Sequence, residues 1–168
     1  MKRILLFTFF SLFSVGIASE AKKESAAPDS KTMSTPSVSL GYVILYVKDV
    51  SASLAFYEKA FGLSKRFFHD DAGKAYGELE TGATRLAFLS LELAKAGLKK
   101  APITTSPSSA PLACEIALVT PDVPAIYARA LKAGATAFAE PSQKPWGQFV
   151  AYVRDIDGHM VEICSPLP

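Results

Sequence analysis

The stretch that decides the fold is GYVILYVKDVSASLAFYEKAFGL, residues 41–63. It begins with an apolar segment of the kind that forms strands, and it continues with apolar residues at helical spacing, namely Leu54, Tyr57 and Phe61. Asp49 or Ser51 can cap this helix by accepting hydrogen bonds from its first N–H groups, and a glycine follows the last apolar residue. The pattern predicts a strand followed by an amphipathic helix.

The same pattern occurs again in CEIALVTPDVPAIYARALKAGA, residues 114–135. Asp122 is the expected N-cap, and Pro124 lies in the first turn, where its missing N–H costs nothing. Ile126 and Ala130 recur at helical spacing, and Gly134 ends the helix. A period of about 72 residues indicates two copies of one structural unit.

Each predicted helix leads into three strand-like segments separated by turn sequences. These segments are 64–69, 74–80 and 83–90 in the first copy, and 136–139, 147–153 and 159–164 in the second. A single unit of this kind leaves one apolar sheet face open, so it must pair with another. We therefore expect an α+β fold of two βαβββ modules, over residues 40–91 and 111–166, joined by a connector over residues 92–110.

The N-terminal residues have the layout of a secretory signal peptide. Lys2 and Arg3 precede the charge-free apolar run 4–18, which is shorter than the roughly 20 residues that a membrane span needs. We expect a signal peptide over residues 1–19, a disordered linker over residues 20–39, and an exported protein, periplasmic or secreted. The alternative is an uncleaved N-terminal anchor.

The charge balance bears on the class of partner. Removal of Lys2 and Arg3 from the 18 basic residues leaves 16, which equals the 16 acidic residues. A balanced mature chain gives no support for nucleic acid or an anionic membrane as a partner. We therefore expect no nucleic acid, and no membrane once the signal peptide is cleaved.

Two segments, LYVKDVSASLAFYEKAFGL (45–63) and PWGQFVAYVRDIDGHMVEICSP (145–166), carry a family resemblance. The chain resembles the vicinal oxygen chelate superfamily over residues 40–166; its members include glyoxalases, bleomycin resistance proteins and extradiol dioxygenases. The resemblance implies that the modules form cup-shaped half-barrels and that a small molecule binds in the cup. It also implies a homodimer, because relatives of this length usually complete their cups across a two-fold axis.

Metal-dependent members of the superfamily place one ligand on the first strand and one on the last strand of each module. In this chain these positions correspond to Tyr42, Ala87 (or Leu86), Glu115 and Glu162. Glu162 is a usual ligand type at the last position, and Glu115 replaces the usual His at the third. The residues at the first two positions are not of the usual ligand types. The resemblance therefore implies at most a divalent metal on Glu115 and Glu162.

Other roles for Glu115 and Glu162 stay open. Because an apolar strand surrounds Glu115, we expect it to be buried beside Glu162, and such a pair needs a cation, a shared proton or a basic partner. The two carboxylates are therefore candidate catalytic residues, as a general acid and base. The structural alternative is a pair bonded to Tyr42, Arg85 or Arg154.

Further residues are expected to line the cup as ligand-binding groups. They are Tyr42, Tyr46, Trp146, Gln148 and Tyr152. Trp146 either closes over a ligand or packs at the barrel rim. Glu78 and Glu80, which alternate with Tyr76 on one strand, either line the first cup or lie on an exposed strand face.

Two function classes agree with these features. The first is a glyoxalase-like lyase or isomerase that acts on a small oxygenated molecule. The second is a metal-free binding protein of the bleomycin resistance type. Strand parity places Cys114 and Cys164 on opposite sheet faces, which argues against a disulfide between them.

Overall fold

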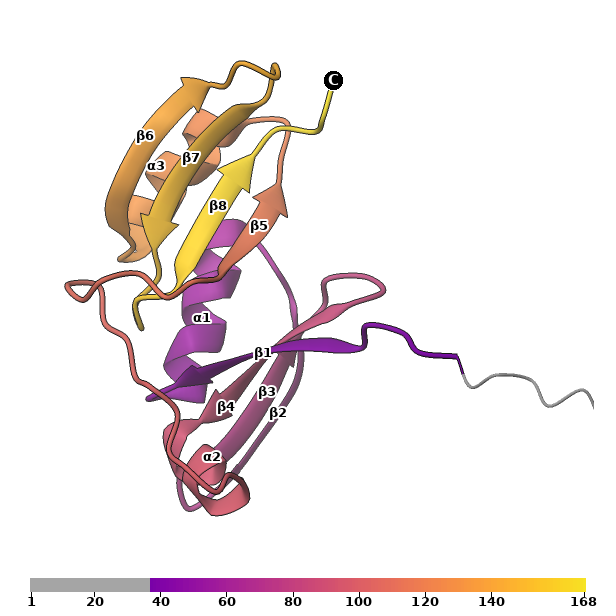
Figure 1. The fold of residues 1–168 in the computed structure, drawn as a ribbon, viewed down its shortest axis with the longest axis vertical. Helices are drawn as coiled ribbons and strands as arrows, with labels where there is room; N and C mark the ends of the chain where they lie inside the picture. The colour runs from indigo at the N-terminus through magenta and orange to yellow at the C-terminus, as the bar shows by residue number, and fades with distance from the viewer. Residues whose placement is uncertain (1–36) are drawn as a thin grey trace, which may run out of the picture. The chain divides into compact units, whose positions relative to one another are not determined.

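The computed structural model describes residues 37–168, which form the expected α+β fold of two βαβββ modules (Figure 1). The predicted signal peptide and nearly all of the predicted linker lie outside the described residues, so export stays a prediction. No helix in the described part of the chain has the length and apolar character needed to cross a membrane.

The first module contains β1, α1, β2, β3 and β4. Their bounds are Tyr42–Val47, Val50–Phe61, Lys65–Asp71, Lys74–Leu79 and Arg85–Ser90. A short helix, α2 (Leu91–Gly97), begins the connector. The second module contains β5, α3, β6, β7 and β8, with bounds Glu115–Val119, Val123–Ala133, Thr136–Gln143, Phe149–Arg154 and Met160–Cys164.

The helix ends agree with the sequence expectations. Asp49 caps α1, since its carboxylate accepts from the N–H of Ala52 at 3.0 Å, and Asp122 caps α3 through Ala125 at 3.1 Å. Both helices end at a glycine in the left-handed conformation, with φ of 73° at Gly62 and 114° at Gly134. These caps define where the chain leaves each helix to start the next strand.

The two sheets have the same topology, β1-β4-β3-β2 and β5-β8-β7-β6. The first strand of each module is parallel to the last, and the other neighbours are antiparallel. Consequently β1 and β5 each have one neighbour and one free edge in the described structure.

Strand β6 differs from expectation. It extends to Gln143, through residues 140–143 that were predicted to be part of a turn. The register with β7 shifts between Ala139 and Ser142, around Pro141. Because β6 is an edge strand and its register is irregular there, a residue without an N–H is tolerated.

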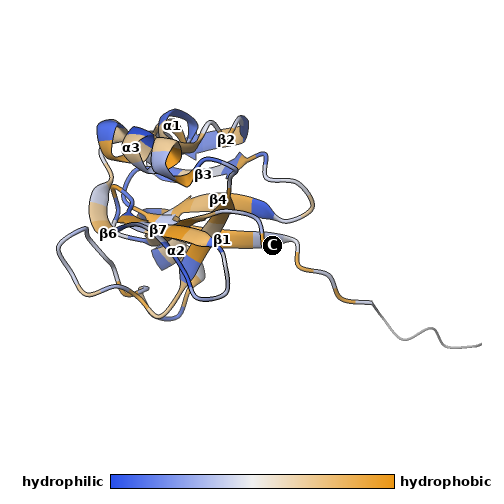
Figure 2. Cartoon of the chain, turned by 90° about the horizontal axis from the view of Figure 1, so that it is seen from above, coloured by the Kyte–Doolittle hydropathy of each residue, from blue (hydrophilic) through white to orange (hydrophobic). Residues whose placement is uncertain are grey.

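The core lies between the helices and one face of each sheet. Leu54 and Tyr57 of α1 are buried against the first sheet, and Ala130 of α3 is buried against the second. The two helices also contact one another, and Arg129 Nε donates to the carbonyl of Ala60 at 2.6 Å. Figure 2 shows α1 and α3 beside each other, each with hydrophobic and hydrophilic segments.

A buried polar network connects the modules. Tyr57 OH donates to Asp155 at 3.1 Å, and Ser53 Oγ donates to Asp157 at 2.7 Å. Asp155 is also 3.0 Å from Nδ1 of His159. We call these five residues the inter-module network; it joins α1 to the turn between β7 and β8.

Candidate functional site

In each module, one face of the sheet points away from the helix, and we call it the open face. On the second sheet this face carries Glu115, Tyr152 and Glu162. In β8, Val161 and Ile163 pack into the core. Because side chains alternate along a strand, Met160, Glu162 and Cys164 lie on the open face.

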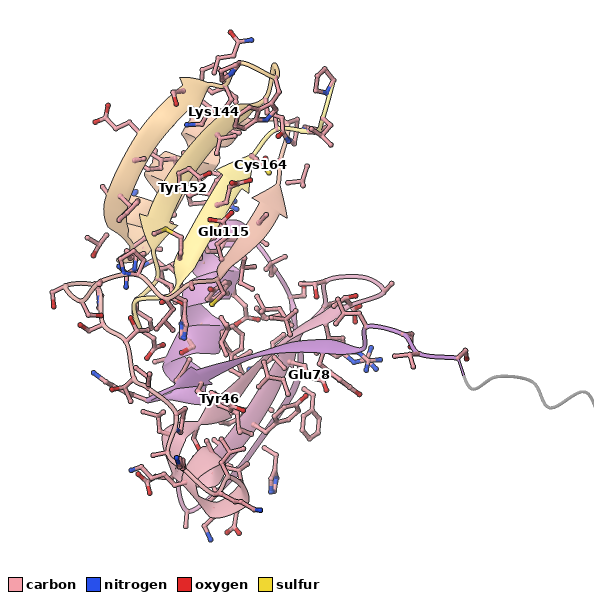
Figure 3. All side chains as sticks on the ribbon, in the orientation of Figure 1. Tyr46, Glu78, Glu115, Lys144, Tyr152 and Cys164 are labelled. Atoms are coloured by element: carbon pink, nitrogen blue, oxygen red, sulfur yellow. The ribbon has the colours of Figure 1, made fainter. Side chains whose placement is uncertain are left out.

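Glu162, Tyr152, Cys164 and Glu115 form one group on this face, which we call the Glu162 cluster. Tyr152 OH donates to Glu162 at 2.7 Å, and these two residues are direct partners in the β7–β8 register. Glu115 is paired with Met160, so it lies diagonally from Glu162 on neighbouring strands. Figure 3 shows Glu115, Tyr152 and Cys164 on these adjacent strands. The structure therefore brings the two predicted carboxylates to one surface.

The carboxylates of the Glu162 cluster perturb two neighbouring groups. The hydrogen bond to Glu162, followed by burial and the charges of Glu162 and Glu115, raises the pKa of Tyr152 to about 12. Burial, followed by interactions with Glu162, raises the pKa of the Cys164 thiol to about 11. At neutral pH Tyr152 is therefore a phenol that donates, and Cys164 is a thiol.

The expectation that Glu115 is buried is wrong for the single chain. Its side chain is exposed and makes no hydrogen bond or ion pair within residues 37–168. The reason is that β5 is an edge strand, so one flank of Glu115 has no neighbouring strand. Glu162 is half-buried, and its partner is Tyr152 rather than Tyr42, Arg85 or Arg154.

A second group lies on the open face of the first module, and we call it the Glu78 cluster. Glu78 accepts from Tyr76 OH at 2.9 Å and lies 3.2 Å from Arg66 Nε and 3.6 Å from Arg85 Nε. Arg85 Nη1 in turn donates to Tyr42 OH at 3.3 Å. Burial and Glu78 together raise the pKa of Tyr76 to about 12, so Tyr76 stays a donor.

Glu78 was not among the predicted site residues, because an exposed strand face explained its alternation with Tyr76 equally well. The structure shows that its side chain is only 12% exposed, since both arginines cover it. The sequence feature that could have indicated this cluster is Glu78 on the same strand face as Tyr76, with Arg85 at the start of the next strand. Sequence parity alone does not show that these side chains meet.

Besides Tyr42, which contacts Arg85 in the first module, three predicted ligand-binding residues lie apart from the two carboxylates. Tyr46 is half-buried on β1 (Figure 3). Because side chains alternate along a strand, it lies on the same face as Tyr42. Trp146 is 56% exposed in the β6–β7 turn, and its indole N–H donates to Gln148 at 2.8 Å. Trp146 is therefore exposed at this turn, and its contact with a ligand stays a prediction. Lys144 begins the same turn, and its Nζ atom lies 5.8 Å from the centre of the Tyr152 ring.

Glu115 also borders a groove between the modules. The groove has a volume of about 460 Å³ and is lined by all of β5 and, in the first module, by Val43, Leu63, Thr81, Thr84, Arg85 and Leu86. Its walls are mostly apolar, with Glu115 and Arg85 as the charged groups. A small organic molecule therefore has room beside Glu115.

The residues at the four family positions do not fit a divalent metal ion. Ala87, and not Leu86, takes the second position, because Leu86 packs into the core. The set is then one phenol, one methyl group and two carboxylates, whereas oxygen-ligated divalent ions take about six ligands. His69 is exposed on β2 and His159 belongs to the inter-module network. Within the described residues, no group of three or more His, Cys, Asp or Glu side chains is arranged to hold a metal.

The two cysteines should differ strongly in reactivity. Both are free thiols; Cys114 is exposed and Cys164 is buried, with its pKa raised from 9.0 to about 11. The thiolate is the reactive form, so the pKa shift alone lowers the reactivity of Cys164 about 100-fold. With a chromogenic thiol reagent at pH 8, we expect one thiol to react quickly in the native protein and the second only after unfolding. Cys114→Ser should remove the fast phase; comparable rates for both thiols would contradict the assignment.

Comparisons with known proteins agree with the geometry. Residues 39–163 match the family described as "Glyoxalase/Bleomycin resistance protein/Dioxygenase superfamily". A search of the curated proteins finds no match. Among solved structures, a glyoxalase-related enzyme from Fulvimarina pelagi is 21% identical, with a TM-score of 0.66 and coverage of 76% of this chain and 88% of that one. A lactoylglutathione lyase from Agrobacterium tumefaciens is 18% identical, with a TM-score of 0.56 and coverage of 78% and 96%. At these identities the structural likeness concerns the fold.

Proposed function

Because the chain belongs to the Glyoxalase/Bleomycin resistance protein/Dioxygenase superfamily, we propose that it binds a small oxygen-containing organic molecule at the Glu162 cluster, without a metal held at the four family positions. The observation that carries this proposal is the 2.7 Å hydrogen bond between Tyr152 and Glu162, with Glu115 beside them on the same face. The donor set at the family positions supports binding by carboxylates rather than by a coordinated ion.

The cluster favours a particular ligand chemistry. Two carboxylates accept hydrogen bonds, so they select hydroxyl or ammonium groups. Tyr152 uses its only O–H on Glu162, so what it offers a ligand is its ring and an acceptor oxygen. The best match is a hydroxylated or amine-bearing molecule with an apolar or aromatic part.

We also propose that a second copy of the chain completes the site. The support is that β1 and β5 have free edges and expose apolar side chains, including Ile44 at 43% and Val119 at 66%. Exposed strand edges of this kind pair readily with another strand. Pairing of β1 with β5 of a second copy would place the Glu78 cluster of one chain next to the Glu162 cluster of the other.

We expect a dimer, and we expect that a charged residue introduced at the edge of β5 dissociates it. Sedimentation of the wild type at micromolar concentration should give a dimer, and Val119→Lys should give a monomer. Ile103→Lys is the matched control, because Ile103 is 84% exposed in the connector. A monomeric wild type, or equal effects of the two lysines, would contradict the proposed interface.

The binding function is tested with a panel of small hydroxylated and amine-bearing aromatic compounds. Compounds that bind should raise the melting temperature of the wild type, because binding to the native state stabilises it. Glu162→Gln should weaken their binding about tenfold or more, since it removes the charged acceptor. Glu92→Gln, on an exposed residue of α2, is the control and should bind normally.

Thermal melting with and without a chelator tests whether the two carboxylates hold a metal ion. If no metal is held, a chelator leaves the melting temperature unchanged in both the wild type and Glu115→Gln. A chelator-induced fall in the wild type that is absent from Glu115→Gln would show that the carboxylates hold an ion, because loss of a bound ligand destabilises the native state.

The second candidate function is a lyase or isomerase. The observation in its favour is that Glu162 is a carboxylate acceptor held beside a neutral phenol, an arrangement that suits proton transfer. Glu162 would take a proton from the bound molecule. Turnover of a compound from the panel that Glu162→Gln abolishes, without loss of folding, would establish this function in place of simple binding.

A further inference from the structure

A second groove lies at the Glu78 cluster. It has a volume of about 430 Å³ and is lined by Arg66, Phe67, Tyr76, Glu78 and Arg85. These residues belong to β2, β3 and β4 of the first module, and none of them belongs to the Glu162 cluster. The groove therefore has its own chemistry.

The two arginines have free donors at this groove. Arg66 Nη1 donates to Glu80 and Arg85 Nη1 donates to Tyr42, while the Nε atoms of both arginines form ion pairs with Glu78 at 3.2 and 3.6 Å. In the described structure, Nη2 of each guanidinium makes no hydrogen bond. The ion pairs with Glu78 orient both guanidinium groups before a ligand binds. Such orientation lowers the conformational entropy that the side chains lose on binding.

The negative charge of Glu78 does not make the groove a cation site. Its carboxylate is 12% exposed and already accepts from Tyr76 as well as facing two guanidinium groups. The groups with unused hydrogen-bonding capacity are therefore donors. Paired guanidinium donors match a planar carboxylate, which they can bind through charge-assisted hydrogen bonds.

Aromatic rings complete the groove. Phe67 is 50% exposed, and its ring centre lies 6.2 Å from that of Tyr76. An exposed phenylalanine ring beside fixed guanidinium groups offers a stacking surface next to the anion donors. The Arg85 guanidinium itself lies over the Tyr42 ring at 5.6 Å, which restricts its movement.

We propose that the Glu78 cluster is a binding site for the carboxylate of a small aromatic acid, held by Arg66 and Arg85 with its ring against Phe67 and Tyr76. Within one chain the two clusters share no residue, so this proposal does not rest on binding at the Glu162 cluster. In the proposed dimer the two sites would lie next to each other.

The probe is benzoate, with benzamide as its neutral analogue and acetate as an anion without a ring. In NMR titrations at pH 7, benzoate should bind saturably with a Kd of about 1 mM, as expected for so small a ligand. The amide signals that shift should belong to β2, β3 and β4. Benzamide and acetate should each bind at least about tenfold more weakly, because each lacks one of the two recognition elements.

Variants separate this site from general charge effects. Arg85→Gln and Arg85→Lys should both lose at least about tenfold in benzoate affinity, since lysine keeps the charge but not the planar fork. Lys95→Gln, which removes an exposed charge on α2, should bind like the wild type. Thermal melting confirms that each variant is folded.

Three results would overturn the proposal: equal binding of benzoate and benzamide, amide shifts confined to β5–β8, or full affinity in Arg85→Lys. The first would indicate an apolar surface without anion recognition. The second would locate the bound anion in the second module. The third would indicate that the positive charge at residue 85 is sufficient and that the planar guanidinium group is not needed. If Glu162→Gln does not weaken binding of the compound panel, the proposed function at the Glu162 cluster fails, but the expected benzoate results at the Glu78 cluster do not change. The two proposals can therefore fail separately.

Discussion

Asp155→Ala is expected to lower the free energy of unfolding by about 3–5 kcal/mol, the cost of removing one partner from a buried charged network. Asp155 is fully buried, and its carboxylate accepts from Tyr57 OH and from the N–H groups of Asp157 and His159. Alanine would leave these donors without a partner in the interior. The change also removes one of the two side-chain hydrogen bonds between α1 and the β7–β8 turn, the one from Tyr57, while the bond from Ser53 to Asp157 is kept.

Urea unfolding of the wild type and the variant measures this effect. The matched control is Asp71→Ala, because Asp71 is exposed at the end of β2 and its loss should change stability by no more than about 0.5 kcal/mol. Asp155→Asn should fall between the two, since the amide keeps one acceptor oxygen. Equal midpoints for Asp155→Ala and Asp71→Ala would contradict the stabilising role of the inter-module network.

The inter-module network also makes the stability of the fold fall at alkaline pH. Burial, followed by the charge of Asp155, raises the pKa of Tyr57 well above its ordinary value of 10.0. The folded state therefore holds this proton more tightly than the unfolded state. Its contribution to stability is complete below pH 10 and is lost as the pH rises further. A melting temperature that falls above pH 10 in the wild type should fall less steeply in Tyr57→Phe.

The order of elements and the helix ends could be predicted because their signals are local. An N-cap carboxylate, apolar residues at helical spacing and a closing glycine lie within one helix length, as in Asp49 to Gly62. Strand parity is local as well. Tyr152 and Glu162 were both expected to line the cup, and the structure pairs them directly in the β7–β8 register. The family resemblance added the pairing of β5 with β8.

The environment of each site residue depended on partners that are distant in the sequence. Whether Glu115 is buried depends on whether another strand covers the edge of β5, and within residues 37–168 none does. Tyr57 and Asp155 are 98 residues apart, and no local pattern links them. Glu78 acquires its significance from Arg66 and Arg85 on the two flanking strands. Long-range packing decides these cases, and a single sequence does not encode it in any short window.

Gly158→Ala is expected to destabilise the protein by about 2–5 kcal/mol, because it combines left-handed backbone strain with a steric clash. Gly158 has a φ of +95°, and a Cβ at this position would overlap the backbone carbonyl group of Ser106. Ser106 cannot simply move away, since its carbonyl oxygen accepts from Arg154 Nη2 at 3.1 Å. The buried Arg154 also donates to the carbonyl of Gly158 at 2.7 Å, so the connector and the β7–β8 turn are held together from both sides.

Gly73→Ala separates the two contributions to this effect. Gly73 has a φ of +85°, but no atom lies within 4 Å of the place that a Cβ would take, so alanine there carries the backbone strain alone, about 1–2 kcal/mol. The difference between the two variants in urea unfolding then measures the contact with Ser106. Limited proteolysis should also cut Gly158→Ala faster near residues 105–109, because the clash displaces the connector from Arg154 while Gly73→Ala leaves it in place. If both variants lose the same stability and are cut at the same rate, the connector is not held by this turn, and its path over the second module has another cause.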